Sequence, residues 1–526
     1  MRKFARFAAR SAGRRWRVSA VVGVAALILV VQGAFALTGT SALNVVFTHG
    51  GTVPRAVEPI SQTNKTTGNI TVGHSYKNDV SGPLMHLRRV ALDTPRPEHE
   101  VPNMHPVSIH QNKPDGVLQK AQHPNSMPSP GLNFDGIAFP GVTCNCAPPD
   151  TNGEVGDTQY VQIVNQGFQV FDKTSGSAVT PALGIGTLWA GFGGACELHG
   201  FGDPVVLYDQ IAGRWVITQF ASATGGTPIT DECIAVSQTS NAAGSYFRYG
   251  YHLGSDFFDY PHFGVWPDAY YMSMNVFNSS GTAFLGPQPF AFNRSAMLSG
   301  SPGTFITSRD PAFFTSSSDA FLPADLDGSI MPPSGAPDPF MMGGENTTAW
   351  KVWRFHVDFG TPANSTFTLA GNLAPAAYTE ICWSGCIPQS GTSSTLAGLG
   401  DRAMYRAAYR RFADGHEALV GNQSVCVGGS GLNCTGGRAG IRWWEISGVT
   451  SGSPAWVQQS TYAPNDGVWR WMGSAAMDQS GDLAIGFSAS NASIVPGVRY
   501  AGRLAGDPAN DLTQGEALLF GGQGSQ

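Results

Sequence analysis

Carboxylate side chains recur just before short stretches of alternating apolar residues, a placement that could serve two kinds of chemistry. One is cation binding, because several carboxylate and amide oxygens around one axis suit calcium, which takes about six to eight oxygen ligands. The residues that best fit such a site are Asp150, Asn152, Asp325 and Asp327. The fragment Asp325–Gly328 matches part of an EF-hand loop without its closing glutamate. Turn chemistry, in which Asp and Asn bond their own backbone, is therefore the competing interpretation.

The second chemistry is hydrolysis of a glycosidic bond, which needs two carboxyl groups in acid and base or nucleophile roles. The candidate catalytic residues are Asp203, Asp259 and Asp401. Candidate ligand-binding side chains, suited to pairing with an anionic sugar or stacking on a sugar ring, are Arg402, Tyr405, Arg406, Trp469, Arg470 and Trp471. Because Tyr405 and Arg406 fall on a predicted strand, a structural salt bridge inside the fold is the alternative use of the same residues.

Other catalytic machinery is not apparent in the sequence. It contains no G-x-S-x-G nucleophile elbow and no H-E-x-x-H metalloprotease helix, and the His416–Glu417 dipeptide lacks the second histidine. Only Lys351 occurs after Lys173, which argues against Schiff-base chemistry or a phosphate-binding lysine in the folded body. We therefore expect no organic cofactor.

The candidate residues belong to a repeat in which a turn aspartate separates two short strands. The turn aspartates are Asp157, Asp209, Asp268, Asp338, Asp414 and Asp478, spaced by 52, 59, 70, 76 and 64 residues. Four strands with long loops fit these spacings, so the pattern predicts an all-β fold with a single β-propeller of six or seven four-stranded blades over residues 136–526. If the units are blades, the loops before their first strands share one face around the central channel. A pair of β-sandwich domains is the alternative.

The N-terminus has the pattern of a secretory signal peptide. Residues 1–17 hold seven basic residues and no acidic one, Val18–Val31 is apolar, and Ala34–Ala36 is an A-x-A cleavage pattern. An uncleaved membrane anchor and a twin-arginine signal at Arg14-Arg15 fit less well. Removal of residues 1–36 would leave 24 basic and 37 acidic residues, a net charge of −13. We therefore expect a secreted, extracellular protein, with the periplasm or the cell surface as alternatives. We expect no membrane span after signal cleavage and no nucleic-acid partner.

Residues 37–135 are rich in Pro, Asn and His and predict an irregular extension before the propeller. All eight cysteines follow the signal, and an even count in an exported chain favours disulfides over zinc. Local pairing is expected for Cys382 with Cys386 and for Cys426 with Cys434. A further bond between Cys196 and Cys233 leaves Cys144 and Cys146, whose C-x-C spacing is tight for an unstrained loop.

Four segments resemble a group of exported bacterial proteins that have no established activity. These segments are Pro148–Gly156, Gly202–Asp209, Tyr260–Tyr271 and Arg470–Ser474. The resemblance spans residue 136 to the end and implies an extracellular β-propeller, loosely similar to sialidase propellers with their Asp-containing turns. Asp478 and Gly481 are one residue too far apart for a sialidase Asp-box, so no catalytic residue is carried over.

The same resemblance bears on the number of blades. Members of this group usually continue past a Gly-Ser-Gln such as Gly524–Gln526 into another Arg- and Trp-rich unit, which implies a seventh blade and a C-terminally truncated chain. A six-unit ring closed by a strand from before Asp150 is the alternative, since an open ring would expose sheet edges.

The leading hypothesis from these observations is an extracellular binding or scaffold module, stabilised by a cation, that recognises a glycan or a cell-surface protein through the channel face. The alternative is a glycoside hydrolase or lyase that uses carboxylates on the same face. The sequence does not define the oligomeric state.

Overall fold

The computed structural model describes residues 64–90, 114–124, 127–138, 149–318, 320–343 and 349–526. All of them belong to one compact unit, Ser61–Gln526. The predicted signal peptide and the pair Cys144 and Cys146 lie outside the described residues. Within those residues, no helix is both long and apolar enough to cross a membrane.

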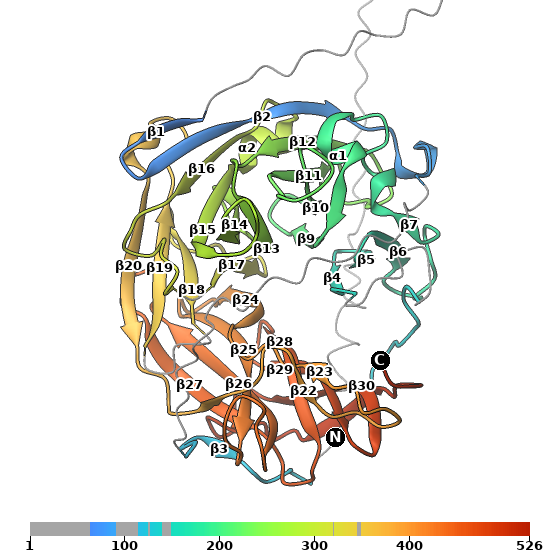
Figure 1. Ribbon diagram of the computed structural model, residues 1–526, viewed down its shortest axis with the longest axis vertical. Helices are drawn as coiled ribbons and strands as arrows, with labels where there is room; N and C mark the ends of the chain where they lie inside the picture. The colour runs from blue at the N-terminus through green and yellow to red at the C-terminus, as the bar shows by residue number, and fades with distance from the viewer. Residues whose placement is uncertain (1–63, 91–113, 125–126, 139–148, 319, 344–348) are drawn as a thin grey trace, which may run out of the picture. The chain divides into compact units, whose positions relative to one another are not determined.

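A group of four consecutive antiparallel strands recurs six times along the described chain (Figure 1). Hydrogen bonds between groups merge four of them into an 11-stranded and a 10-stranded sheet, and each group of four is called a sheet below. Sheets 1 and 2 contain β4 (Asn152–Val155), β5 (Gln159–Val164), β6 (Gly167–Asp172) and β7 (Leu183–Gly184), then β9 (Val206–Asp209), β10 (Arg214–Ala221), β11 (Asp231–Ser237) and β12 (Tyr246–His252). Sheets 3 and 4 contain β13 (Phe257–Val265), β14 (Ala269–Phe277), β15 (Phe284–Asn293) and β16 (Thr304–Ser308), then β17 (Phe321–Asp327), β18 (Asp338–Met342), β19 (Trp350–His356) and β20 (Thr366–Leu373). Sheets 5 and 6 contain β24 (Met404–Arg411), β25 (Glu417–Val427), β26 (Arg438–Ser447) and β27 (Ala455–Tyr462), then β28 (Trp469–Met477), β29 (Leu483–Asn491), β30 (Ile494–Arg503) and β31 (Glu516–Phe520).

The short elements lie between or beside these sheets. They are β1 (Lys65–Thr67), β2 (Ile70–Val80), β3 (Leu118–Gln119), β8 (Gly200–Gly202), β21 (Thr379–Glu380), β22 (Gly385–Ile387) and β23 (Leu396–Ala397), with helices α1 (Gly194–Leu198) and α2 (Arg294–Ser299) and 3-10 turns at Leu84–His86, Ile185–Thr187 and Pro362–Asn364. Helix is therefore a minor part of the described chain.

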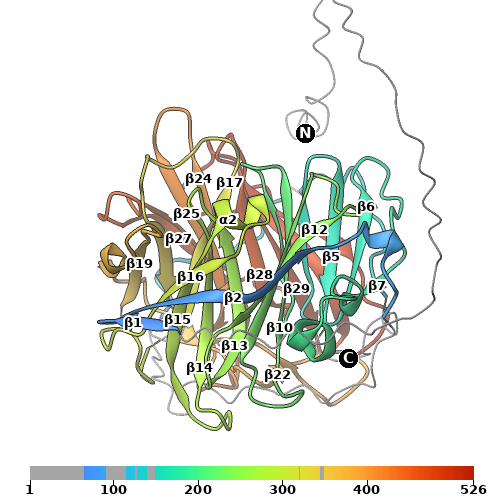
Figure 2. The same ribbon diagram turned by 90° about the horizontal axis from the view of Figure 1, so that it is seen from above.

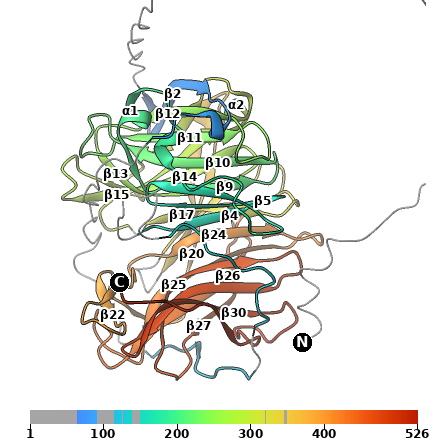
Figure 3. The ribbon, with the colours of Figure 1, turned by 90° about the vertical axis from the view of Figure 1, so that its right-hand side faces the viewer.

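These sheets form a β-propeller, which confirms the predicted all-β propeller fold, whereas the number of blades stays a prediction (Figure 1, Figure 3). The first strand of each sheet lies on the inside: β4 packs beside β9, β9 beside β13, and β13 beside β17. β17 and β24 run parallel and are joined by hydrogen bonds. Each predicted turn aspartate lies at or beside the turn from a first to a second strand. Asp478 caps its turn by accepting hydrogen bonds from the backbone of Ser480 and Asp482, as an Asx turn requires.

The core lies between neighbouring sheets. One buried cluster joins sheets 1 and 2, another joins sheets 2 and 3, a third joins sheets 3, 4 and 5, and a fourth joins sheets 5 and 6. Successive side chains along a strand point to opposite faces of its sheet. Each sheet therefore packs one set of side chains against the preceding sheet and the other set against the following sheet. The buried tryptophans Trp215, Trp266, Trp350 and Trp444 fill these layers.

The predicted N-terminal extension contributes a strand to the propeller. β2 pairs antiparallel with β12 on one side and with β16 on the other, so it joins the outer edges of sheets 2 and 3 (Figure 2). Asp79 on β2 forms a bidentate ion pair with Arg248 on β12, at 2.7 and 2.8 Å. The polar composition of residues 37–135 gave no sign of this strand.

A second part of the extension contacts the last sheet and the first. Asn133 donates a hydrogen bond to the carbonyl of Leu519 on β31, and the Tyr500 hydroxyl donates to the carbonyl of Pro128. The Phe134 ring packs against Phe171 of sheet 1, with 5.0 Å between ring centroids. Among the described residues, none of the buried clusters joins sheets 6 and 1, and residues 127–137 contact both sheets.

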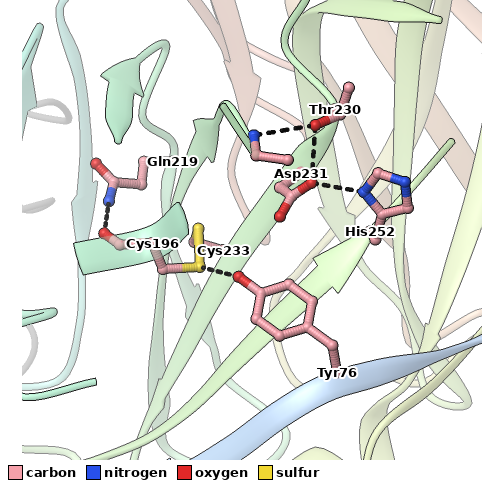
Figure 4. The surroundings of a disulfide bond; sticks show 8 residues. Tyr76, Cys196, Gln219, Thr230, Asp231, Cys233 and His252 are labelled. Carbon is pink, nitrogen blue, oxygen red and sulfur yellow. Dashed lines mark hydrogen bonds and ion pairs between the residues drawn. A yellow bond between two sulfur atoms is a disulfide. The ribbon is translucent and has the colours of Figure 1, made fainter. Parts of the chain in front are cut away.

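Three of the expected disulfides are present. Cys196 bonds Cys233, Cys382 bonds Cys386, and Cys426 bonds Cys434. The first ties α1 to β11, and the Tyr76 hydroxyl of β2 lies 3.3 Å from the Cys196 sulfur (Figure 4). This disulfide therefore holds sheet 2 at the point where β2 crosses it.

Candidate functional site

The candidate residues from the sequence lie along the first strands of the sheets. Asp150, Asp203 and the pair Asp401–Arg402 come just before β4, β9 and β24, and Asp259 lies near the start of β13. These four positions are at the same end of the first strands. We call this end the channel face.

The strands are irregular where they carry these side chains. The register of β13 against β14 shifts between Asp259 and His262, and the register of β24 against β25 shifts between Met404 and Ala408. Tyr260 has a φ of 58°, in the left-handed region that a tyrosine rarely adopts. Bulges and strained backbone re-aim side chains and concentrate at functional sites.

Residues of sheets 3 and 5 meet at the channel face. The Arg402 guanidinium lies over the Tyr260 ring, 4.6 Å from its centroid, and forms a bidentate ion pair with the buried Asp401 at 2.7 Å for both bonds. The His262 ring stacks on the Tyr405 ring, with 5.1 Å between centroids and 7° between planes. One aromatic stack and one cation–π contact therefore lie beside the start of β13.

Two buried polar atoms in this group have no hydrogen-bond partner among the described residues. They are Oδ2 of Asp259 and Nε2 of His262, in side chains that belong to residues 5% and 7% exposed. Burial raises the pKa of Asp259 to about 7, and the nearby Asp150 carboxylate also raises it. Burial, together with the Arg402 charge, lowers the pKa of His262 to about 3. The site thus combines a neutral imidazole with a carboxyl group that titrates near neutral pH.

Asp150 and Asp203 approach the same group from sheets 1 and 2. The Asn165 side chain connects them, because its Nδ2 donates to Asp150 at 2.6 Å and its Oδ1 accepts from the backbone N–H of Asp203 at 3.1 Å. Both aspartates have positive φ angles, 42° and 40°. The geometry therefore brings Asp150 and Asp203 together with Asp259 at one end of the channel.

A second polar cluster surrounds Arg406. Its guanidinium pairs with Asp325, and with Asp327 at 2.9 Å, both on β17. Burial raises the pKa of Glu154 on β4 to about 7 and that of Asp325 to about 6, and the Arg406 charge opposes both shifts. The Tyr405 hydroxyl donates to the carbonyl of Phe263 at 3.1 Å. Carboxylates from sheets 1 and 4 thus share one cation from sheet 5.

The predicted calcium ligands are divided between the two clusters. Asp325 and Asp327 face the Arg406 guanidinium, the Asn152 Oδ1 accepts from the backbone of Val206 at 3.1 Å, and Asp150 bonds Asn165. Among the described residues, no three His, Cys, Asp or Glu side chains are arranged to hold a metal ion. Calcium stays a prediction.

The three candidates on β28 lie apart from these clusters. Arg470 is fully buried and pairs with Glu516 at 2.7 Å and Asp466 at 2.6 Å. Trp471 packs in a cluster with the disulfides Cys382–Cys386 and Cys426–Cys434, and Trp469 lies beside that cluster. Their described contacts are those of a structural core.

Sequence reasoning did not single out His262, Tyr260, Glu154 or Asn165 as site residues. His262 and Tyr260 sit in a segment rich in aromatic residues, where burial in the core is the ordinary interpretation. Only the nearness in sequence of Tyr260 and His262 to the candidate Asp259 could have signalled a role. Asn165 follows a strand end, which is typical of turn residues.

No protein-family model matches the sequence, and no curated protein matches it. Similar solved structures include a GH43 β-1,3-galactosidase, with 10% identity and a TM-score of 0.30 over 73% of this chain and 78% of that chain. An exo-β-1,3-galactanase from Clostridium thermocellum has 10% identity and a TM-score of 0.30 over 71% and 76% of the two chains. An endo-arabinase from Bacteroides thetaiotaomicron has 16% identity and a TM-score of 0.26 over 56% and 92%. None of these is a sialidase, and at such identities and TM-scores no activity is transferred to this chain.

Proposed function

We propose that the protein is an extracellular carbohydrate-binding propeller whose channel face holds the ligand. The observation that carries the proposal is the unpartnered pair of buried polar atoms, Asp259 Oδ2 and His262 Nε2, beside the rings of Tyr260 and Tyr405. Buried polar atoms without partners are rare in proteins and call for a ligand or water that completes their bonds. Sugar hydroxyls both donate and accept, so they match an acidic oxygen and an imidazole nitrogen together.

The exposure of the surrounding residues supports this arrangement. Asp150 is exposed and Tyr260 is half-buried, whereas Asp259 and His262 lie beneath them. A ring face of the ligand would contact the tyrosine, and its hydroxyl groups would reach the buried pair. Pockets for small ligands have this composition, with aromatic walls and a few placed polar groups. Export fits the disulfides, since such bonds persist in oxidising compartments.

A glycoside hydrolase acting at the same face is the second candidate. The raised pKa of Asp259, about 7, favours it, because a general acid must hold its proton near the working pH. Asp150 is the neighbouring carboxyl group, and its charge is one cause of that raised pKa. In this candidate mechanism, Asp259 protonates the glycosidic oxygen and Asp150 acts as base or nucleophile.

A time-resolved glycan array with the full secreted chain tests both candidates. A stable signal that falls at least tenfold in Tyr260→Leu and Asp259→Asn supports a binding site, and a signal that decays as glycan is consumed supports a hydrolase. Asp358→Asn, in an exposed loop of sheet 4, is the matched control for charge. Absence of binding and turnover across the array, with and without calcium, would reject both candidates.

A further inference from the structure

A separate pocket of about 350 Å³ lies between sheets 5 and 6, away from the channel face. Phe412 and Met477 line it at the ends of the first strands β24 and β28, and Arg503 lines it at the end of β30. Because the channel-face residues precede or begin the first strands, this pocket opens at the opposite end of the sheets. No residue of the channel site contributes to it.

The pocket contains a buried arginine that forms no ion pair within 4.0 Å among the described residues, although its charge acts on the nearby carboxyl groups of Asp507 and Asp482. Arg503 is 5% exposed, and its Nη2 donates to the carbonyl of Asp507 at 2.6 Å. Its Nε is buried without a hydrogen-bond partner, and no acidic side chain of the described chain lies within 4.0 Å of the guanidinium. An arginine has five donors, and a buried guanidinium is costly unless an anion completes it.

The pocket also contains a buried carboxylate without a cation. Glu445 is 8% exposed, and its Oε2 accepts one hydrogen bond from Gln458 at 2.6 Å. Among the described residues it forms no ion pair, with Arg503 or with any other basic side chain. One pocket therefore presents a positive group and a negative group that do not neutralise each other.

The other parts of the pocket lining are apolar side chains or a loop that hydrogen bonds hold in place. Met477 and Val457 supply apolar surface, and the Phe412 ring is stacked by His416 with 4.0 Å between centroids. The loop after β30 is fixed by Asp507, whose Oδ2 accepts from the backbone of Leu504 at 2.7 Å. The same loop is tied to sheet 5, because the Asn510 Oδ1 accepts from the backbone of Gln459 at 2.9 Å and the Asn510 N–H donates to Gln458 at 3.1 Å. The pocket is thus built in advance of any ligand.

The charges of the lining select the class of ligand. Glu445, Asp507 and Arg503 together carry one net negative charge, so an anion would add to an existing excess. A molecule with one ammonium and one carboxylate leaves this balance unchanged and can form a close ion pair with each of Glu445 and Arg503. We propose that the pocket binds a free α-amino acid with an apolar side chain: its carboxylate on Arg503, its ammonium on Glu445, and its side chain against Phe412 and Met477.

Calorimetric titration of the full secreted chain with L-leucine, L-methionine and L-phenylalanine tests the proposal. At least one of them should bind with 1:1 stoichiometry. Acetylation of its amine and, separately, amidation of its carboxylate should each weaken binding at least tenfold, as expected when a charged hydrogen bond is lost. These ligand changes leave the protein untouched, so the result does not depend on a variant folding.

Variants provide the second arm of the test. Glu445→Gln and Arg503→Met should each weaken binding at least tenfold, while Arg499→Met, a charge-matched change elsewhere on β30, should not. Glycan binding at the channel face should be unchanged in all three, which separates failure here from failure of the proposed function. The inference is overturned if none of the amino acids binds below about 10 mM, or if the acetylated and amidated forms bind as tightly as the parent.

Discussion

The guanidinium of Arg402 lies over the ring of Tyr260, 4.6 Å from its centroid, and so connects sheet 5 to sheet 3 across the inner strand of sheet 4. The stack of His262 on Tyr405 and the hydrogen bond from Tyr405 to Phe263 make the same connection. Three contacts between blades that are not sequence neighbours hold the start of β13 in place. The buried atoms of Asp259 and His262 are therefore presented by a rigid part of the fold.

Loss of the ion pair between Asp401 and Arg402 should strongly lower the stability of the protein. Arg402→Met removes the bidentate partner of Asp401, whose side chain is fully buried, and should lower the free energy of unfolding by about 3–5 kcal/mol. The double variant Asp401→Asn/Arg402→Met should recover part of that loss, because no buried charge is left unpaired. Urea unfolding of Asp401→Asn, Arg402→Met and the double variant measures the coupling energy between the two residues. Simple additivity of the two losses would contradict it.

The pKa of Asp259 should make stability depend on pH. Its pKa is about 7 in the fold against 3.8 as the ordinary value, so the folded state holds the proton more tightly. The tighter proton binding contributes about 4 kcal/mol to the free energy of unfolding. This contribution is fully present below about pH 4 and is lost as the pH rises through 7. Asp259→Asn should therefore be more stable than the wild type at pH 8, by thermal unfolding.

His262 makes stability depend on pH in the direction opposite to Asp259, because its pKa falls from 6.5 to about 3 in the fold. Its contribution to stability is present above pH 6.5 and is lost as pH falls toward 3. The difference between wild type and Asp259→Asn isolates the carboxyl group from this effect. A difference that stays constant from pH 4 to 8 would show that Asp259 keeps an ordinary pKa.

The three disulfides should contribute to stability in the order of the loops they close. Sequence separations of 37, 8 and 4 residues correspond to about 4, 2.5 and 2 kcal/mol from loop-closure entropy. Paired serine substitutions at Cys196 and Cys233 should therefore lower the free energy of unfolding most. Chemical unfolding of the three double-serine variants gives the order, and the largest loss at Cys382–Cys386 would contradict the entropic account.

Strand β2 should tolerate no side chain at Gly73. A Cβ at this position would lie 2.2 Å from ring carbons of the fully buried Phe305. Gly73→Ala should therefore destabilise the protein by about 1–3 kcal/mol, as overpacking does. Gly116→Ala is the control, because its Cβ would meet no atom within 4 Å. Equal melting temperatures for the two variants would show that β2 is loosely held.

Short-range patterns in the sequence were enough to predict the propeller fold. The six turn aspartates mark the turns between first and second strands. At Asp209, Asp414 and Asp478 the carboxylate accepts a hydrogen bond from the backbone two residues on, a short-range Asx pattern that one sequence can display. Strand β2 was missed, since its pairing depends on β12 and β16, far along the chain, and more than half of its own residues are polar. Non-local contacts of this kind leave no periodic signal.

The positions of the candidate residues, though not their roles, were anticipated in part for the same reason. Loop position before a first strand predicted that Asp150, Asp203 and Asp259 lie at one end of the channel, and the structure places them there. The burial of His262 and the isolation of Arg470 beside Glu516 depend on how the blades pack. The spacing of residues within one sheet does not predict which side chains are buried by contacts with other parts of the chain.

Strand β2 also sets the order in which the protein can be completed. Asp79 and its partner Arg248 are 169 residues apart, and Asn78 donates a hydrogen bond to the carbonyl of Gly300, 222 residues further on. Because a chain is synthesised from its N-terminus, β2 exists long before the two strand edges that it joins. Closure of this seam must therefore wait until β16 has been synthesised, and until then the edges of β12 and β16 stay open to pairing with other chains.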